Sequence, residues 1–471
     1  MPPSKDAMLR KIPSVDVLLQ DAALRQAAAG VPRRIVVDTV RAAVEETRSR
    51  LLAEAAPDAT EADLRAGILA RARERLREVW TPHFRRAINA TGIILHTGLG
   101  RAVLPAKAVR QIADELSGYS LLQVDVETGK RSRRDGRIEW MLQQLTGCEA
   151  ATVVNNNAAA TMIVLSAVAR GKEVIVSRGQ LVEIGGSFRL PEVMAASGAK
   201  LVEVGTTNKT HPRDYENAIT ENTAAILRVH PSNYKIYGFT AEVALDELVR
   251  IAHARNLVLI DDVGAGALLD FSRFGFADEP TLPNSIRAGA DLMTSSADKL
   301  IGGSQGGIIL GKAALVEKVR KSPLARILRV GKLTLAALEA TLSLFFDEAL
   351  ALSEVPTLEM LVRGLPQISQ QAERIAGSVR TRAAGAAVTV IDGASQVGSG
   401  SLPTRDIPTR LVSIAPAGMT PDALAARLRR QTPPVFARIQ EDKVLLDPRT
   451  LLAGDEEPLI EALVAAMAAG E

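Results

Sequence analysis

Apolar residues near the amino end of the chain recur at the spacing of an amphipathic helix. The clearest series is Leu64, Ile68, Leu69, Leu76 and Val79. Such intervals place side chains on one face of a helix. Alanine, leucine, arginine and glutamate dominate residues 16–80, and glycine is nearly absent there. We therefore predict a separate helical domain over residues 1–80.

The pattern changes after Pro82, where short β-branched runs alternate with segments of helical length. The runs typical of buried strands are residues 151–154, 173–176, 200–204, 224–229, 257–260 and 307–310. Continuous apolar strands separated by helices indicate a mainly parallel sheet with helices on its faces. We expect this large α/β domain to cover residues 81–330.

A smaller domain is predicted at the carboxyl end. A long helical stretch, residues 333–352, precedes two apolar runs at residues 409–414 and 443–446, with a helix from about Pro421 between them. We expect a small α+β domain over residues 331–471. The predicted fold class of the whole chain is α/β.

Composition excludes several classes of protein. The 471 residues carry 57 Lys+Arg against 54 Asp+Glu, a net charge of +3, unlike proteins that coat nucleic acid indiscriminately. Cys148 is the single cysteine, so an intramolecular disulfide and a cysteine-based zinc site are excluded, and no metal site is predicted. The longest apolar stretches run about a dozen residues, short of the roughly 20 that cross a bilayer. We expect a cytoplasmic protein.

Lys299 is the first candidate for chemistry. It follows a predicted strand end and precedes a glycine-rich turn, and Ser296 stands three residues before it. A hydroxyl there could hold a phosphate oxygen, and glycine permits close approach of the backbone to a ligand. The pattern is typical of a lysine that forms a Schiff base with a carbonyl cofactor. The alternative is a lysine that only pairs with a carboxylate.

Two further segments carry polar residues at predicted strand ends. Asp261 and Asp262 end a buried strand, where a carboxylate can keep a pyridinium nitrogen protonated; we take Asp261 as the candidate, although either could serve. Asn155, Asn156 and Asn157 lie between a strand and an alanine-rich helix, whose start can bind a phosphate. The alternatives are turn and N-cap roles. Taken in order, phosphate cradle, aspartate and lysine match a fold-type I pyridoxal-phosphate enzyme.

Longer motifs strengthen this interpretation. They include Ile88-Asn-Ala-Thr-Gly-Ile-Ile-Leu-His-Thr-Gly-Leu-Gly-Arg-Ala, Asp125-Val-Glu-Thr-Gly-Lys-Arg, Gly205-Thr-Thr-Asn-Lys-Thr-His and Leu335-Ala-Ala-Leu-Glu-Ala-Thr-Leu. With them the chain resembles the bacterial selenocysteine synthases, the L-seryl-tRNA(Sec) selenium transferases. The resemblance implies that Lys299 carries pyridoxal 5′-phosphate and that seryl-tRNA(Sec) becomes selenocysteinyl-tRNA(Sec) by loss of water and addition of selenium from selenophosphate. It also implies a large homo-oligomer built from dimers, a homodecamer, with the helical domain recognising the tRNA.

The second substrate requires an anion site. Arginine suits a tetrahedral oxyanion, and Arg326 and Arg329 stand at the i, i+3 spacing of one helical face. The resemblance carries selenophosphate binding onto Arg101, Arg326 and Arg329; surface ion pairing is the alternative. His230 could contact the cofactor ring or be merely structural, and the role of Arg438 is left open.

Two rival functions remain at this stage. A pyridoxal-phosphate lyase acting on a small amino acid or an amino sugar phosphate would share the core but would not need residues 1–80. A non-catalytic tRNA-binding protein would not need Lys299. The arginines of residues 71–86 fit either tRNA contact or a solvated helix with ion pairs.

Overall fold

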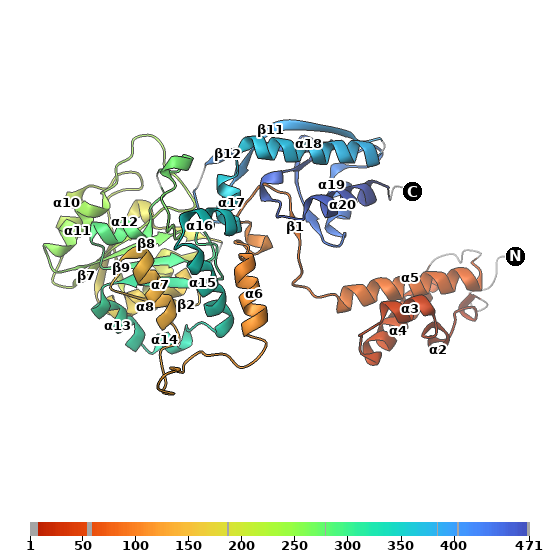
Figure 1. Ribbon diagram of the computed structural model, residues 1–471, viewed down its shortest axis with the longest axis horizontal. Coiled ribbons are helices and arrows are strands. Elements are labelled where there is room, and N and C mark those ends of the chain that lie inside the picture. Colours follow the sequence, from red (N-terminus) through yellow and green to blue (C-terminus); the bar gives the residue numbers. More distant parts are fainter. Residues whose placement is uncertain are drawn as a thin grey trace. The chain divides into compact units, whose positions relative to one another are not determined.

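The computed structural model describes residues 8–53, 59–185, 188–277, 279–383, 385–402 and 405–468. It divides the chain into two compact units, Met1–Arg86 and Ala87–Glu471 (Figure 1). Within the described ranges, no helix is long and apolar enough to cross a membrane.

The first unit is helical, as the sequence predicts. Its helices are α2 (Val15–Leu18), α3 (Ala22–Ala27), α4 (Arg33–Ala53) and α5 (Glu61–Trp80). A capping box at Thr60 and Asp63 starts α5, because each residue satisfies a backbone N–H of the other. The core of the unit consists of its own apolar residues, among them Leu18, Val40 and Ile68.

The second unit is built on a seven-stranded sheet in the order β2-β10-β9-β8-β7-β3-β6. The strands are β2 (Ala150–Val154), β3 (Glu173–Ser177), β6 (Lys200–Val204), β7 (Thr223–Val229), β8 (Val258–Gly264), β9 (Leu292–Ser296) and β10 (Gly307–Gly311). Strand β10 is antiparallel to both of its neighbours, β2 and β9, and the other neighbouring pairs in this sheet are parallel. The mainly parallel α/β architecture is therefore confirmed.

Helices cover both faces of this sheet (Figure 1). Those of the second unit up to residue 362 are α6 (Ala106–Glu115), α7 (Gly136–Thr146), α8 (Asn157–Ala169), α9 (Leu190–Ser197), α10 (Pro212–Ala218), α11 (Leu245–His253), α12 (Leu282–Ala288), α13 (Ala313–Lys321), α14 (Leu324–Ile327), α15 (Lys332–Leu344), α16 (Glu348–Glu354) and α17 (Pro356–Val362). One apolar core joins one sheet face to α7, α11, α12 and α15. The other core joins the opposite face to α8, α9 and α13.

The long helix predicted over residues 333–352 is wrong in one respect, because it is two helices. Helix α15 ends at Leu344, and the Asp347 side chain accepts hydrogen bonds from the backbone of Ala349 and Leu350 to start α16. Leu335 and Leu338 of α15 pack in the core of the large sheet, so this segment belongs with that sheet.

A second, antiparallel sheet lies near the carboxyl end, in the order β11-β12-β15-β14. Its elements and the remaining ones are β11 (Ala387–Gln396), β12 (Asp406–Ala415), β14 (Arg438–Gln440), β15 (Lys443–Leu446), α18 (Leu365–Arg382), α19 (Pro421–Arg429), α20 (Glu456–Ala468), and the short strands β1 (Ile88–Asn89), β4 (Glu183–Ile184), β5 (Phe188–Arg189) and β13 (Val435–Phe436). The two predicted strands are present in β12 and β15. Strands β11 and β14 were not predicted; much of each is exposed to solvent.

Candidate active site

Lys299 lies just beyond the end of β9 and is 5% exposed. Its Nζ donates to the Gly400 carbonyl over 3.4 Å, in the loop between β11 and β12. Burial lowers the pKa of the Lys299 amine, and the nearby carboxylates of Asp262 and Asp298 oppose this shift. A lowered pKa increases the neutral, nucleophilic fraction of a lysine.

The two adjacent aspartates of β8 point to opposite faces of the sheet. Asp262 lies on the α8 face, where Asn157 Nδ2 donates to it over 2.8 Å and Thr161 Oγ1 over 3.3 Å. Burial raises the pKa of Asp262, while its hydrogen bonds and Lys299 act to lower it. Asp262 is therefore the aspartate that the fold brings to Lys299.

Asp261 lies on the other face and has different partners. It accepts hydrogen bonds from Arg228 Nη1 at 2.8 Å and Ser285 Oγ at 2.6 Å, and it is fully buried. Both carboxylate oxygens are thus bound to groups of β7 and α12. The structure does not bring Asp261 into the cluster around Lys299.

The phosphate candidates lie in one row across the sheet. Val154, at the end of β2, and Ser296, at the end of β9, both pair with Gly307 of β10. Asn156 caps α8, because its Oδ1 accepts the backbone N–H of Ala159 at 2.9 Å. The start of α8 and the Ser296 hydroxyl thus belong to the same edge of the sheet.

Asn155 connects this edge to the segment that carries two of the predicted arginines. Its backbone N–H donates to the Leu328 carbonyl over 3.0 Å. With its side-chain amide oriented so that Nδ2 faces these acceptors, Asn155 also donates to the carbonyls of Leu328 and Arg329 at 3.0 and 3.1 Å. Asn155 therefore positions backbone rather than pointing at a phosphate.

The three predicted anion-binding arginines come from two segments. Arg101 Nη1 lies 2.8 Å from Asp298 Oδ2, beside a cavity of about 400 Å³ that Gln305 also lines. Helix α14 ends at Ile327, so the exposed Arg329 follows the helix and does not share a helical face with Arg326. Gln305 Nε2 donates to the Asn155 carbonyl over 3.4 Å and so connects the cavity to this segment.

Arg134 is a basic residue that the sequence analysis did not single out. It donates to the Val330 carbonyl over 3.0 Å and to Gln123 Oε1 over 2.8 Å. Burial, followed by the positive charges of Arg329 and Arg326, lowers the pKa of Arg134. Clustered guanidinium groups of this kind suit a multiply charged anion. The run of arginines at residues 131–137 was the available signal.

His230 follows β7 and lies beside Asp262, because its backbone N–H donates to the Asp262 carbonyl at 3.0 Å. Its Nε2 is 3.9 Å from Oε2 of the buried Glu279. Both residues line a second cavity of about 460 Å³. Burial raises the pKa of Glu279 to about 7. Glu279 is a further residue that the sequence analysis missed, since a single glutamate in a loop carries no pattern.

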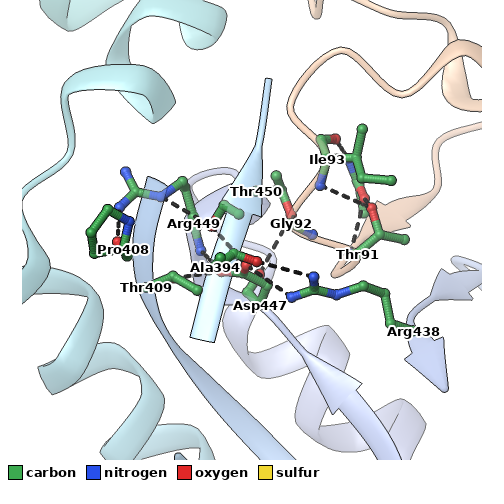
Figure 2. Close-up of polar contacts among 12 residues, drawn as sticks. Thr91, Gly92, Ile93, Ala394, Pro408, Thr409, Arg438, Asp447, Arg449 and Thr450 are labelled. Carbon is green, nitrogen blue, oxygen red and sulfur yellow. Dashed lines mark hydrogen bonds and ion pairs between the residues drawn. The ribbon is translucent and has the colours of Figure 1, made fainter. Parts of the chain in front are cut away.

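Arg438 has a structural role (Figure 2). It donates to the Ala394 carbonyl over 3.0 Å and to Asp447 Oδ2 over 3.4 Å. Asp447 also accepts from Ser395, Thr409 and the backbone of Arg449, and the Arg449 guanidinium is bound by backbone carbonyls including that of Pro408. This buried network holds the small sheet together.

These residues fit pyridoxal phosphate. Lys299 supplies the amine, Asp262 supplies a buried carboxyl for a pyridine nitrogen, and the start of α8 with Ser296 suits a phosphate. Among the described residues, the buried Asn157 Oδ1 beside this cluster lacks a hydrogen-bond partner. A buried polar atom of this kind favours a polar ligand at this place.

Comparison with known proteins agrees with this geometry. The family model for L-seryl-tRNA selenium transferase matches residues 87–452, and the model for the selenocysteine synthase N-terminal region matches residues 9–48. The chain is 47% identical to the L-seryl-tRNA(Sec) selenium transferase of Solidesulfovibrio magneticus, covering 97% of this chain and 98% of that protein. It is 45% identical to that of Desulfomicrobium baculatum, covering 98% and 99%.

Solved structures agree on the fold. D-glucosaminate-6-phosphate ammonia-lyase superimposes with a TM-score of 0.56 at 20% identity, covering 83% of this chain and 99% of that one. The predicted fold-type I architecture is confirmed, and so is the resemblance on which the sequence analysis drew. The chain belongs to the L-seryl-tRNA selenium transferase family.

Proposed function

We propose that this chain converts L-seryl-tRNA(Sec) to L-selenocysteinyl-tRNA(Sec), with pyridoxal phosphate as cofactor and selenophosphate as selenium donor. The observation that carries the proposal is a buried lysine, Lys299, within the electrostatic influence of a buried carboxyl, Asp262, in a chain whose full-length relatives bear this name. Because the substrate is a transfer RNA, we place the enzyme in the cytoplasm.

We assign a separate role in the reaction to each group of the site. Pyridoxal phosphate, when bound, accepts the electrons released at the substrate α-carbon. Lys299 would hold the cofactor and, once displaced by the substrate amine, take the α-proton as a general base, which its lowered pKa favours. Asp262 would keep the pyridine nitrogen protonated, a role that we assign to it rather than to Asp261. The start of α8 and Ser296 would hold the phosphate.

The selenium donor is a small anion with a tetrahedral oxyanion group. We propose that Arg101, Arg326 and Arg329 bind it, with Arg134 as a fourth basic group. Planar guanidinium groups match such an oxyanion through paired hydrogen bonds. The segment held by Asn155 carries Arg329, so the phosphate edge and this anion site share a support.

The helical unit is the proposed tRNA-recognition domain, and the enzyme a homo-oligomer. Part of the arginine run in α5 is engaged in ion pairs, since Arg71 contacts Glu46 and Glu74 at 3.0 and 2.8 Å. The ion-pair interpretation therefore accounts for some of these arginines. Arginines exposed to solvent in this unit include Arg33, Arg34 and Arg77. Binding through them should weaken steeply as salt rises.

A visible absorption spectrum tests the proposal. The full chain and Lys299→Ala are compared before and after addition of seryl-tRNA(Sec) and, separately, free serine. A band that Lys299→Ala lacks and that shifts only with the charged tRNA supports both cofactor and substrate. A band that responds only to free amino acids indicates the small-molecule lyase, and the absence of any band contradicts the enzyme.

A further inference from the structure

The buried carboxyl groups that act electrostatically on Lys299 include Asp262, Asp298 and Glu279. Asp262 is bound by Asn157 and Thr161, and Asp298 is bound by Arg101. Glu279 differs, because its Oε1 is buried and has no hydrogen-bond partner among the described residues.

Glu279 is nevertheless held in a defined place. Its side chain is 2% exposed, and its Oε2 lies 3.9 Å from His230 Nε2, which is too long for a hydrogen bond. The backbone N–H of Leu402 donates to its carboxyl group. Leu402 stands two residues after Gly400, the acceptor of the Lys299 amine. One short segment therefore contacts both Lys299 and Glu279.

The charges around Glu279 come from several elements. Lys299 faces it from the end of β9, and His230 faces it from the end of β7. The cavity that Glu279 lines also carries the basic residues Arg228, Lys209, Lys235 and Arg405, and the exposed acid Glu242. Burial dominates over these charges and raises the pKa of Glu279 to about 7. A carboxyl group with this pKa is populated in both protonation states at neutral pH.

The proposed reaction needs such a group. Hydroxide is a poor leaving group, so the β-hydroxyl of the seryl substrate must receive a proton as its bond to carbon breaks. Lys299 carries the α-proton at that stage. A separate acid matched to neutral pH would leave that proton on Lys299 for its return to the α-carbon.

We propose that Glu279 is the general acid that protonates the departing β-hydroxyl, an inference that rests on the proposed function. The Cβ–O bond breaks with its electron pair on oxygen, and the carboxyl proton of Glu279 joins that oxygen to form water. Glu279 is left as a carboxylate and regains a proton from water in the cavity. Lys299 retains the α-proton for the later return to the α-carbon.

Leaving-group dependence tests this role. With seryl-tRNA(Sec), Glu279→Gln should lose about 100-fold or more in elimination, the usual contribution of a general acid. Elimination is followed by the pyruvate that forms when the dehydrated amino acid hydrolyses. Exchange of the α-hydrogen with deuterium from solvent should persist, because it depends on Lys299. With 3-chloroalanyl-tRNA(Sec), the variant should match the wild type, since chloride leaves without a proton.

Glu242→Gln is the matched control, because it removes an exposed acid from the same cavity wall. Glu242→Gln should eliminate from seryl-tRNA(Sec) and from 3-chloroalanyl-tRNA(Sec) at the wild-type rate. An equal loss of Glu279→Gln with both substrates would overturn the assignment. A wild-type chain that eliminates from neither seryl-tRNA(Sec) nor serine would instead refute the proposed function, and the Glu279 role with it.

A second readout does not depend on turnover. The infrared spectrum of the full chain without cofactor should contain the carbonyl band of a neutral carboxylic acid at pH 6. That band should fade as the pH rises through about 7 and should be missing from Glu279→Gln. A wild-type spectrum without this band would also overturn the assignment.

Discussion

The guanidinium group of Arg101 lies 2.8 Å from the carboxylate of Asp298, the residue that directly precedes Lys299. An arginine proposed to bind the selenium donor is thereby tied to the backbone of the cofactor lysine. Arg101 also has a positive φ of 62°, a conformation that non-glycine residues adopt rarely. The ion pair with Asp298 helps to hold Arg101 in this conformation.

Loss of the Asp298 carboxylate should therefore weaken binding of selenophosphate. We expect Asp298→Asn to raise KM for selenophosphate about tenfold, since an ion pair of this kind is worth about 1–2 kcal/mol where it is partly buried. The Lys299-dependent absorption should persist. Steady-state kinetics measure the effect. The control is Arg255→Ala, at an exposed arginine after α11. An unchanged KM would show that Arg101 needs no such support.

Substitutions of the two aspartates of β8 should have different effects, one on catalysis and the other on stability. Asp262→Asn should keep the bound cofactor but slow elimination by about 100-fold or more, because the pyridine nitrogen loses its acidic partner. Asp261→Asn should instead lower the free energy of unfolding by about 3 kcal/mol, because it leaves Arg228 buried with a neutral partner. Turnover and urea unfolding of both variants decide the assignment. The reverse result would assign the contact with the pyridine nitrogen to Asp261.

Glu279 should make the stability of the protein depend on pH. Its folded-state pKa of about 7 lies above the ordinary 4.5, so the folded state binds more protons between these values. Stability from this group is present at low pH and is lost as pH rises through about 7. Relative to Glu279→Gln, the wild type should lose about 3 kcal/mol between pH 4.5 and pH 7.5. Urea unfolding followed by Trp140 fluorescence in a Trp80→Phe background measures this, and parallel curves would contradict it.

The network around Asp447 should not tolerate a side chain at Gly92. A Cβ at Gly92 would lie 2.1 Å from Asp447 Oδ2, and the residue has a φ of +74°. We expect Gly92→Ala to prevent folding of the second unit or to lower its unfolding temperature by more than about 5 °C, the shift that a loss of a few kcal/mol produces in a chain of this size. Calorimetry checks this. Gly136→Ala, at a position with open space around it, is the control.

Much of the fold could be predicted because buried strands carry their signal in consecutive residues. The apolar runs of β3 and β7 require burial on both sheet faces, which helices provide. They can be recognised in the sequence because their apolar residues are consecutive. Lys299 could be found for the same reason, since its neighbours Ser296 and the following glycines are local.

The choice between Asp261 and Asp262 lay beyond the sequence. Neighbouring strand residues point to opposite faces, so one carboxyl group must face α8 and the other α12. Which face carries α8 depends on how the chain crosses the sheet. Local pattern does not contain that information.

Glu279 and Arg134 were missed for a related reason. Their importance arises from residues distant in sequence, such as His230 for the first and Arg329 for the second. Strand β11 was missed because it pairs with β12 over its length while much of its own surface faces water. Each case depends on a partner that only the folded chain supplies.

The helical unit has an apolar core of its own residues, with Leu18, Val40 and Ile68 at its centre. Substitutions that loosen this core act on that unit and leave the packing around Lys299 intact. The surface that we propose for RNA can therefore diverge during evolution without retuning the chemistry, and the sheet that carries Lys299 can be engineered without rebuilding the proposed tRNA-binding unit.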